Sequence, residues 1–208
     1  NAFYVLDLSQ LPKHSKGHLD VSNAASGIIK LIDNIDNRYS FVGNEGTLFT
    51  FRTDKDAPRY KLVQVELNAP TEMKEIIPQH EKDVLSWACA VKGDKMVVCY
   101  LRDCYNVLEL RKSSTGELIS EIDIPSFGCV SEFSGKKKQS EVFFSHQSMI
   151  VPPTVYRFDT ESRKLSVVHS TQIPGFNADD YEAKQVFVDS YDQRVKIPMF
   201  VTHKKGVE

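Results

Sequence analysis

Few residues in this sequence have the types and spacing that catalysis or metal binding needs. His80-Glu81 begins like the His-Glu-x-x-His helix of zinc hydrolases, but the fifth position is Val84 and the segment is typical of a turn followed by a strand. Cys99 and Cys104 flank a predicted strand end without a second pair of ligands at zinc-finger spacing. We therefore expect no metal site, and we expect these two cysteines to pack in strands.

Three polar clusters invite functional interpretations that their surroundings do not favour. Asp179-Asp180 could be a general acid/base pair, but adjacent acids in a polar connection are usually solvated or cap a short turn. The run Lys136 to Lys138 alone makes a weak anion site and fits a solvated turn between strands. The glycines of Gly43-Asn44-Glu45-Gly46 fit a hairpin turn better than a phosphate loop. No cofactor is predicted.

A serine nucleophile is also missing from the sequence. Serine hydrolases of the α/β class carry the serine in a strained Gly-x-Ser-x-Gly elbow, which projects the hydroxyl toward a histidine base and an oxyanion hole. None of the 208 residues lies in such a pentapeptide. We predict no catalytic, cofactor-binding or metal-binding residue in this chain.

Composition narrows the classes of partner. The 26 basic and 28 acidic side chains give a formal charge of −2, too small to attract nucleic acid or an anionic membrane strongly. No apolar run approaches the roughly 20 residues that span a bilayer. The four cysteines lie in or near apolar segments, so we expect buried free thiols in a reducing compartment, with a disulfide as the alternative: Cys89, Cys99, Cys104 and Cys129. With no glycosylation sequon and no secretory signal, the sequence favours the cytoplasm.

The periodic segments predict an all-β chain. They are short, rich in β-branched and aromatic residues, and bounded by Gly, Pro, Asn or Asp. The longest connection, Gln10 to Gly27, suits a solvent loop. The predicted strands cover residues 2–8, 28–32, 38–42, 47–52, 60–67, 74–77, 85–91, 95–101, 105–111, 117–122, 128–133, 140–145, 154–158, 164–169, 183–188 and 195–203.

A repeat of strand, polar turn and strand indicates how these strands are grouped. Its corresponding positions, Leu67, Arg111 and Asp159, are 44 and 48 residues apart, with four predicted strands in each interval. Four-stranded units of this length are the blades of β-propellers. About three blades and a leading strand fit before Ile173, and Trp87 is expected to pack between strands. Three blades cannot close a ring, so we expect more of the same chain to complete it, including residues before Asn1, where there is no initiator Met.

The pattern changes near Pro174 to Asn177, where a short polar connection leads to two further strands. We therefore divide the chain into a partial propeller over 1–175 and a second domain that begins at 176–208.

Several phrases resemble prolyl oligopeptidase, a serine peptidase family, in that family's order. The resemblance spans the whole chain and is carried by Lys30-Leu31-Ile32-Asp33-Asn34, Asn44-Glu45-Gly46-Thr47-Leu48-Phe49-Thr50-Phe51, Pro78-Gln79-His80-Glu81-Lys82-Asp83-Val84-Leu85-Ser86-Trp87 and Lys196-Ile197-Pro198-Met199-Phe200-Val201-Thr202-His203-Lys204-Lys205-Gly206.

The resemblance implies a seven-bladed propeller over an α/β-hydrolase domain. The chain would then hold the later blades and the first hydrolase strands, and the catalytic triad would follow Glu208. The implied activity is cleavage of short proline-containing peptides after proline, with the propeller restricting entry. Two alternatives stay open: a peptide macrocyclase of the same family, and a propeller that serves only as a binding scaffold.

The sequence departs from the family at one hairpin. The family usually has an Asp-Gly turn before its Lys-Ile-Pro phrase, whereas this chain has Asp192-Gln193-Arg194-Val195. Because a type I′ turn needs positive φ at both central residues, losing the glycine predicts a looser loop.

Overall fold

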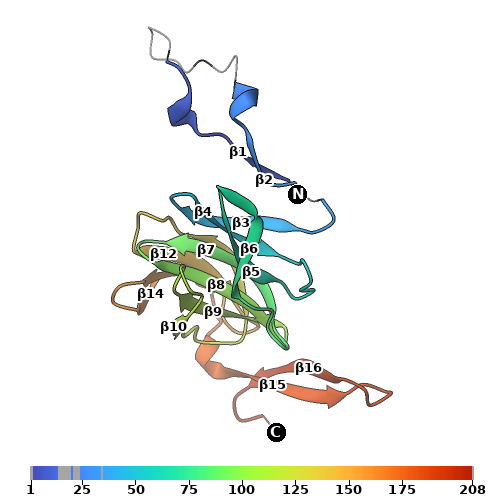
Figure 1. The fold of residues 1–208 in the computed structure, drawn as a ribbon. Helices are drawn as coiled ribbons and strands as arrows, with labels where there is room; N and C mark the ends of the chain where they lie inside the picture. The colour runs from blue at the N-terminus through green and yellow to red at the C-terminus, as the bar shows by residue number, and fades with distance from the viewer. Residues whose placement is uncertain (1, 14–19, 21–23, 34, 208) are drawn as a thin grey trace. The chain divides into compact units, whose positions relative to one another are not determined.

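A computed structural model describes residues 2–13, 20, 24–33 and 35–207 of the chain. The chain divides into two compact units, Asn1–His80 and Glu81–Glu208. Within the described ranges the structure contains strands and three short 3-10 helices, and no α-helix (Figure 1). None of the helices in these ranges has the length and apolar character that crossing a bilayer would require.

The first unit contains a two-stranded and a four-stranded sheet. Strands β1 (Phe3–Val5) and β2 (Ile29–Ile32) pair with each other. The first four-stranded sheet is an antiparallel meander of β3 (Tyr39–Glu45), β4 (Leu48–Thr53), β5 (Lys61–Glu66) and β6 (Ala69–Ile77). Its core joins both sheets, since Leu31 and Ile32 of β2 pack with Tyr39, Phe51 and Val65.

The second unit contains two more four-stranded meanders and a long hairpin. The second sheet consists of β7 (Val84–Val91), β8 (Lys95–Arg102), β9 (Tyr105–Arg111) and β10 (Leu118–Ile122). The third sheet consists of β11 (Cys129–Ser134), β12 (Glu141–Gln147), β13 (Thr154–Asp159) and β14 (Lys164–Ser170). After a 3-10 turn at Ala178–Asp180, strands β15 (Tyr181–Asp189) and β16 (Lys196–Lys204) form the hairpin.

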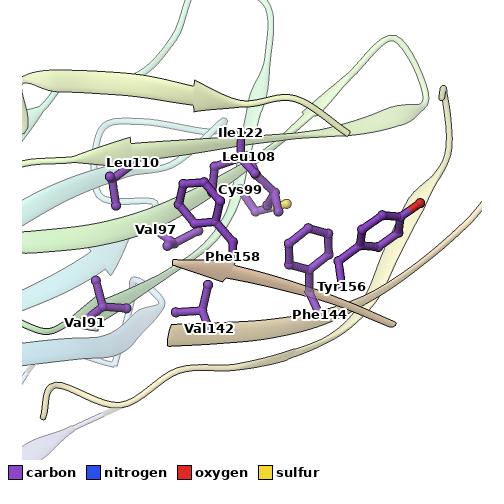
Figure 2. Packing of buried hydrophobic residues seen from close by; sticks show 10 residues of the cluster. All are labelled: Val91, Val97, Cys99, Leu108, Leu110, Ile122, Val142, Phe144, Tyr156 and Phe158. Atoms are coloured by element: carbon purple, nitrogen blue, oxygen red, sulfur yellow. The ribbon is translucent and has the colours of Figure 1, made fainter. Parts of the chain in front are cut away.

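The second and third sheets bury a shared apolar core. Side chains in a strand alternate between its faces, so every second residue of β8 and β9 points to the same side. Figure 2 shows these side chains facing those of β12 and β13. Trp87 adds a ring contact with Phe133, at 4.6 Å between centroids, which confirms its predicted packing role. The buried members are Val91, Val97, Cys99, Leu108, Leu110, Ile122, Val142, Phe144, Tyr156 and Phe158.

The predicted repeat is confirmed in position as well as length. Leu67 directly follows β5, while Arg111 and Asp159 end β9 and β13. Each therefore marks the end of the third strand of a four-stranded sheet. The repeat detected in the sequence is the turn from the third strand to the fourth.

The predicted strands are present, with three differences of three or more residues at one end. The first is β3, which extends to Glu45 instead of residue 42. Only Phe3–Val5 of the predicted strand 2–8 is extended, because Asp7 caps a 3-10 turn at Leu8–Gln10 by accepting from the Ser9 amide at 2.9 Å. Strand β6 begins at Ala69 rather than Lys74. The segment Asn68 to Glu72, predicted as a polar turn, thus lies mostly in β6, and Pro70 is tolerated there because β6 is an edge strand, where a missing amide donor costs little.

The turns follow the predicted chemistry only in part. The hairpin after β3 is made by Gly46-Thr47, with φ of 55° at Gly46, whereas Gly43 lies in β3 at a register shift. The loop that joins β15 and β16 spans six residues, 190–195, and Gln193 has a φ of 58°. This confirms the looser loop expected from the absence of glycine. The predicted solvent loop at 10–27 falls largely on 14–19 and 21–23, which lie outside the described residues.

The predicted boundary near residue 175 lies between β14 and β15 and stays a prediction. The third sheet ends at Ser170, and the hairpin begins at Tyr181.

Candidate functional site

A pocket of about 420 Å³ lies at one end of the second sheet. It forms where β8 ends, β9 begins and β10 continues into the loop that leads to the third sheet. Pockets that bind small molecules or peptide groups have volumes of about 300 to 1,000 Å³. The lining residues are Arg102, Tyr105, Asn106, Val107, Glu121, Ile122, Asp123, Ile124, Pro125, Ser126, Phe127, Ile150 and Ala183.

Arg102 is held in the pocket wall by a buried acid. Its Nε donates to Oδ2 of Asp83 at 2.7 Å, and Asp83 is only 2% exposed. The hydrogen bond to Asp83 is the main reason that the pKa of Arg102 is raised. A charge-assisted bond of this length fixes the guanidinium and offsets its positive charge.

The loop from β10 to β11 is fastened to the start of β9. The backbone N–H of Asn106 donates to the Gly128 carbonyl at 2.9 Å. The side-chain oxygen of Asn106 accepts from the backbone N–H of Val130 at 2.8 Å. Gly128 has no room for a side chain, since a Cβ there would lie 2.2 Å from the Gln147 carbonyl oxygen. These contacts give the pocket wall a defined backbone position.

His146 lies beneath this loop, on β12. Its side chain is 1% exposed, its ring makes an edge contact with Tyr156 at 6.3 Å, and a Cβ on Gly128 would lie 2.6 Å from its Nε2. Burial lowers the pKa of His146, while the nearby Ser126 backbone acts in the opposite direction and is the smaller effect. Neither ring nitrogen reaches a hydrogen-bond partner of good geometry within the described part of the chain. The ring is therefore neutral at pH 7.

The hairpin of β15 and β16 contacts this same end of the second sheet. The Gln185 side-chain amide donates to the Asp103 carbonyl at 2.7 Å, and the rings of Phe127 and Phe200 lie 5.9 Å apart. The ammonium of Lys82 lies 5.5 Å from the centre of the Phe187 ring. The hairpin thus helps to enclose the pocket, to which it contributes Ala183.

The residues considered as metal ligands do not come together. No group of three or more His, Cys, Asp or Glu side chains suited to a metal occurs among the residues that are described. His80 and Glu81 lie in the connection between β6 and β7. Asp179 and Asp180 form an exposed 3-10 turn capped by Asn177, and Lys136 to Lys138 are exposed in the β11–β12 turn.

The four cysteines are free thiols, as predicted, but only Cys99 is fully buried; Cys89 is half-buried, and Cys104 and Cys129 are exposed. All four are free, and Cys99 is buried in β8, where burial is the main cause that raises its pKa to about 12. Cys104 is exposed, because Asp103 and Cys104 form the two-residue β8–β9 turn with φ of 43° and 71°. Cys129 is exposed at the first position of β11.

Comparison with known families identifies this arrangement. Residues 1–171 match the family described as the prolyl oligopeptidase N-terminal β-propeller domain. The chain belongs to the prolyl oligopeptidase family. Its three four-stranded sheets are therefore blades of that family's propeller.

Two of the curated relatives are prolyl endopeptidases that are longer than this chain. A prolyl endopeptidase from Dictyostelium discoideum is 31% identical over 200 residues, which cover 90% of this chain and 26% of that protein. A prolyl endopeptidase from Elizabethkingia miricola is 29% identical over 185 residues, covering 86% and 25%. The chain thus spans about a quarter of the length of these relatives.

Solved structures show the same fold. Prolyl oligopeptidase B from Galerina marginata, in its apo form, covers 100% of this chain with a TM-score of 0.82 at 23% identity. The chain corresponds to 28% of that protein. At this identity the likeness concerns the fold alone.

No local pattern in the sequence predicts the pocket. Its wall combines Arg102, the loop residues 121–127, Ile150 and Ala183, which are distant in the sequence. The one sequence feature that points to it is Phe127, a large aromatic residue in a short loop between predicted strands, which the structure shows to be 39% exposed.

Proposed function

We propose that this chain forms part of the propeller of a serine peptidase that cleaves short peptides after proline. The observation that carries the proposal is the match of residues 1–171 to the prolyl oligopeptidase propeller, together with relatives named prolyl endopeptidase. The hairpin of β15 and β16 would open the α/β-hydrolase domain, from residue 176 onward. The serine, acid and base would lie outside these 208 residues, which is supported by the absence of a Gly-x-Ser-x-Gly elbow.

The proposed contribution of the blades is steric. A ring of stacked sheets leaves a narrow central channel, and a domain closed over it admits flexible oligopeptides while excluding folded proteins. The buried core between the second and third sheets supports this role, because it stacks neighbouring blades firmly. The remaining blades and the peptidase domain would be supplied by the same protein.

A fluorogenic Gly-Pro substrate tests this proposal and separates it from a pure binding scaffold. The 208-residue chain alone should release no fluorophore, whereas the longer protein that includes these residues should do so. Turnover by the chain alone would refute the proposed absence of the catalytic residues. No turnover by the longer protein would favour the scaffold.

A second question is which acceptor takes the acyl group of the cleaved peptide: water, which gives a linear product, or the amine of the same peptide, which gives a macrocycle. In Amanita bisporigera, a prolyl oligopeptidase A is 30% identical to this chain and a dual function macrocyclase-peptidase is 28% identical. We propose water as the acceptor, which is supported by the relatives named prolyl endopeptidase, at 29% and 31% identity. Mass spectrometry of the products distinguishes the outcomes, because a linear product is heavier than its macrocycle by one water.

We also propose a cytoplasmic location. Four free cysteines support it, because exposed thiols such as Cys104 tend to oxidise in secretory compartments. Cell fractionation with an antibody against the chain tests this, and recovery in the secreted fraction would contradict it.

A further inference from the structure

The pocket at the end of the second sheet has a net negative charge. Its one cation, Arg102, is bound to the buried carboxylate of Asp83 at 2.7 Å. Glu121 and Asp123 also line the pocket, and both are exposed. Neither forms an ion pair within 4 Å among the residues that the structure covers, although the charge of Glu121 acts on Arg102 from a greater distance. Two carboxylates are thus available to a ligand.

An aromatic surface adjoins these carboxylates. The rings of Tyr105 and Phe127 lie 5.1 Å apart in an edge-to-face arrangement, and both line the pocket. Phe127 is 39% exposed, so part of its ring remains accessible beside the pocket. Aromatic faces attract cations, and they do so more strongly where water is partly excluded.

The wall also contains an unused hydrogen-bonding group. The hydroxyl oxygen of Ser126 is buried and has no hydrogen-bond partner among the described residues. Buried hydroxyls usually have a partner, because leaving one unpaired costs free energy. Ser126 itself lines the pocket, so a change of its side-chain rotamer would turn this covered hydroxyl toward a ligand.

We propose that this pocket binds the cationic side chain of a lysine or arginine in a peptide substrate. The inference rests on the proposed function, since it takes the ligand to be a peptide. The carboxylates of Glu121 and Asp123 pair with the charge, and the rings of Tyr105 and Phe127 cover the aliphatic stem. An anionic ligand is disfavoured, because Arg102 is already neutralised. The enzyme would therefore prefer basic residues at a position remote from the scissile proline.

Matched peptides test the proposal in the full-length protein. Each is an N-acetylated Gly-Pro-coumarin substrate that carries either lysine or norleucine at one upstream position, and a series moves this residue along the peptide. At low salt, the lysine peptide should have a KM about fivefold below its norleucine partner at one or more positions, since an exposed ion pair contributes modestly. The preference should vanish at high salt, where charges are screened.

Variants locate the effect in the pocket. The double change Glu121→Gln and Asp123→Asn should raise the KM of the lysine peptide until it is about equal to the KM of its norleucine partner, as expected for loss of a binding interaction. Glu132→Gln is the matched control, because Glu132 is an exposed carboxylate on β11 that does not line the pocket. This variant should keep the preference.

Two results would overturn the proposal: a wild-type preference absent at every position, or one that survives the double change. If neither peptide is hydrolysed, the proposed function fails separately. Fluorescence anisotropy with the same peptides, labelled with a dye, then measures their affinities for the protein and tests the pocket independently of hydrolysis. Equal affinity for lysine and norleucine peptides would refute it, and tighter lysine binding that the double change abolishes would support it.

Discussion

Phe143 and Phe144, adjacent on β12, should respond very differently to truncation. Phe144 is 1% exposed, stacks on Tyr156 at 5.5 Å between ring centroids, and belongs to the core between the second and third sheets. Phe143 points to the opposite face and is 37% exposed. Replacing a buried phenylalanine by alanine costs about 3 to 5 kcal/mol, because it removes apolar contacts and leaves a cavity. The exposed ring should cost about 1 kcal/mol.

Amide hydrogen exchange measures this difference locally in the 208-residue chain, where no further blade among the described residues covers the face that carries Phe143. In Phe144→Ala, peptides covering β12 and β13 should exchange about a thousandfold faster, since about 4 kcal/mol of local stability is lost and each 1.4 kcal/mol is about tenfold. Phe143→Ala, the control on the same strand, should change exchange by less than about tenfold. Equal acceleration in both variants would refute the assignment of this core to the interface between stacked blades.

Two further predictions concern the loop that forms the pocket wall. Because burial lowers the pKa of His146 below that of the unfolded chain, only the unfolded state takes up this proton as the pH falls below about 6.5. The free energy of unfolding should therefore decrease from pH 7 to pH 5, and His146→Leu should reduce that decrease. Urea unfolding at both pH values measures it, and an equal decrease in the variant and the wild type would contradict the prediction. Gly128→Ala should destabilise by about 1 to 3 kcal/mol, because the new Cβ overlaps the Gln147 carbonyl; a neutral result in the same assay would show that the loop yields easily.

The strands and their grouping could be predicted because both signals are local. Alternation of apolar residues marks each strand, and a turn after every third strand repeats at the length of one blade. The looser loop around Gln193 was equally predictable, since a single missing glycine removes the tight turn.

Other features depend on the assembled structure. The exposure of Cys104 follows from a two-residue turn with positive φ at both positions, which the surrounding apolar residues concealed. The start of β6 at Ala69 depends on its place at the sheet edge, where Pro70 is acceptable. The pocket is lined by Arg102, Ile150 and Ala183, which are distant in the sequence and come together only when the blades stack and the hairpin packs. No local pattern therefore predicts it.

Cleavage of one proline-containing segment in two settings tests the central claim most directly. The segment is offered to the full-length protein first as an unstructured peptide and then as an exposed loop of a stably folded protein. A peptidase gated by a propeller should cut the free peptide after proline and leave the folded protein intact. Equal cleavage of both, or cleavage at sites unrelated to proline, would contradict the account.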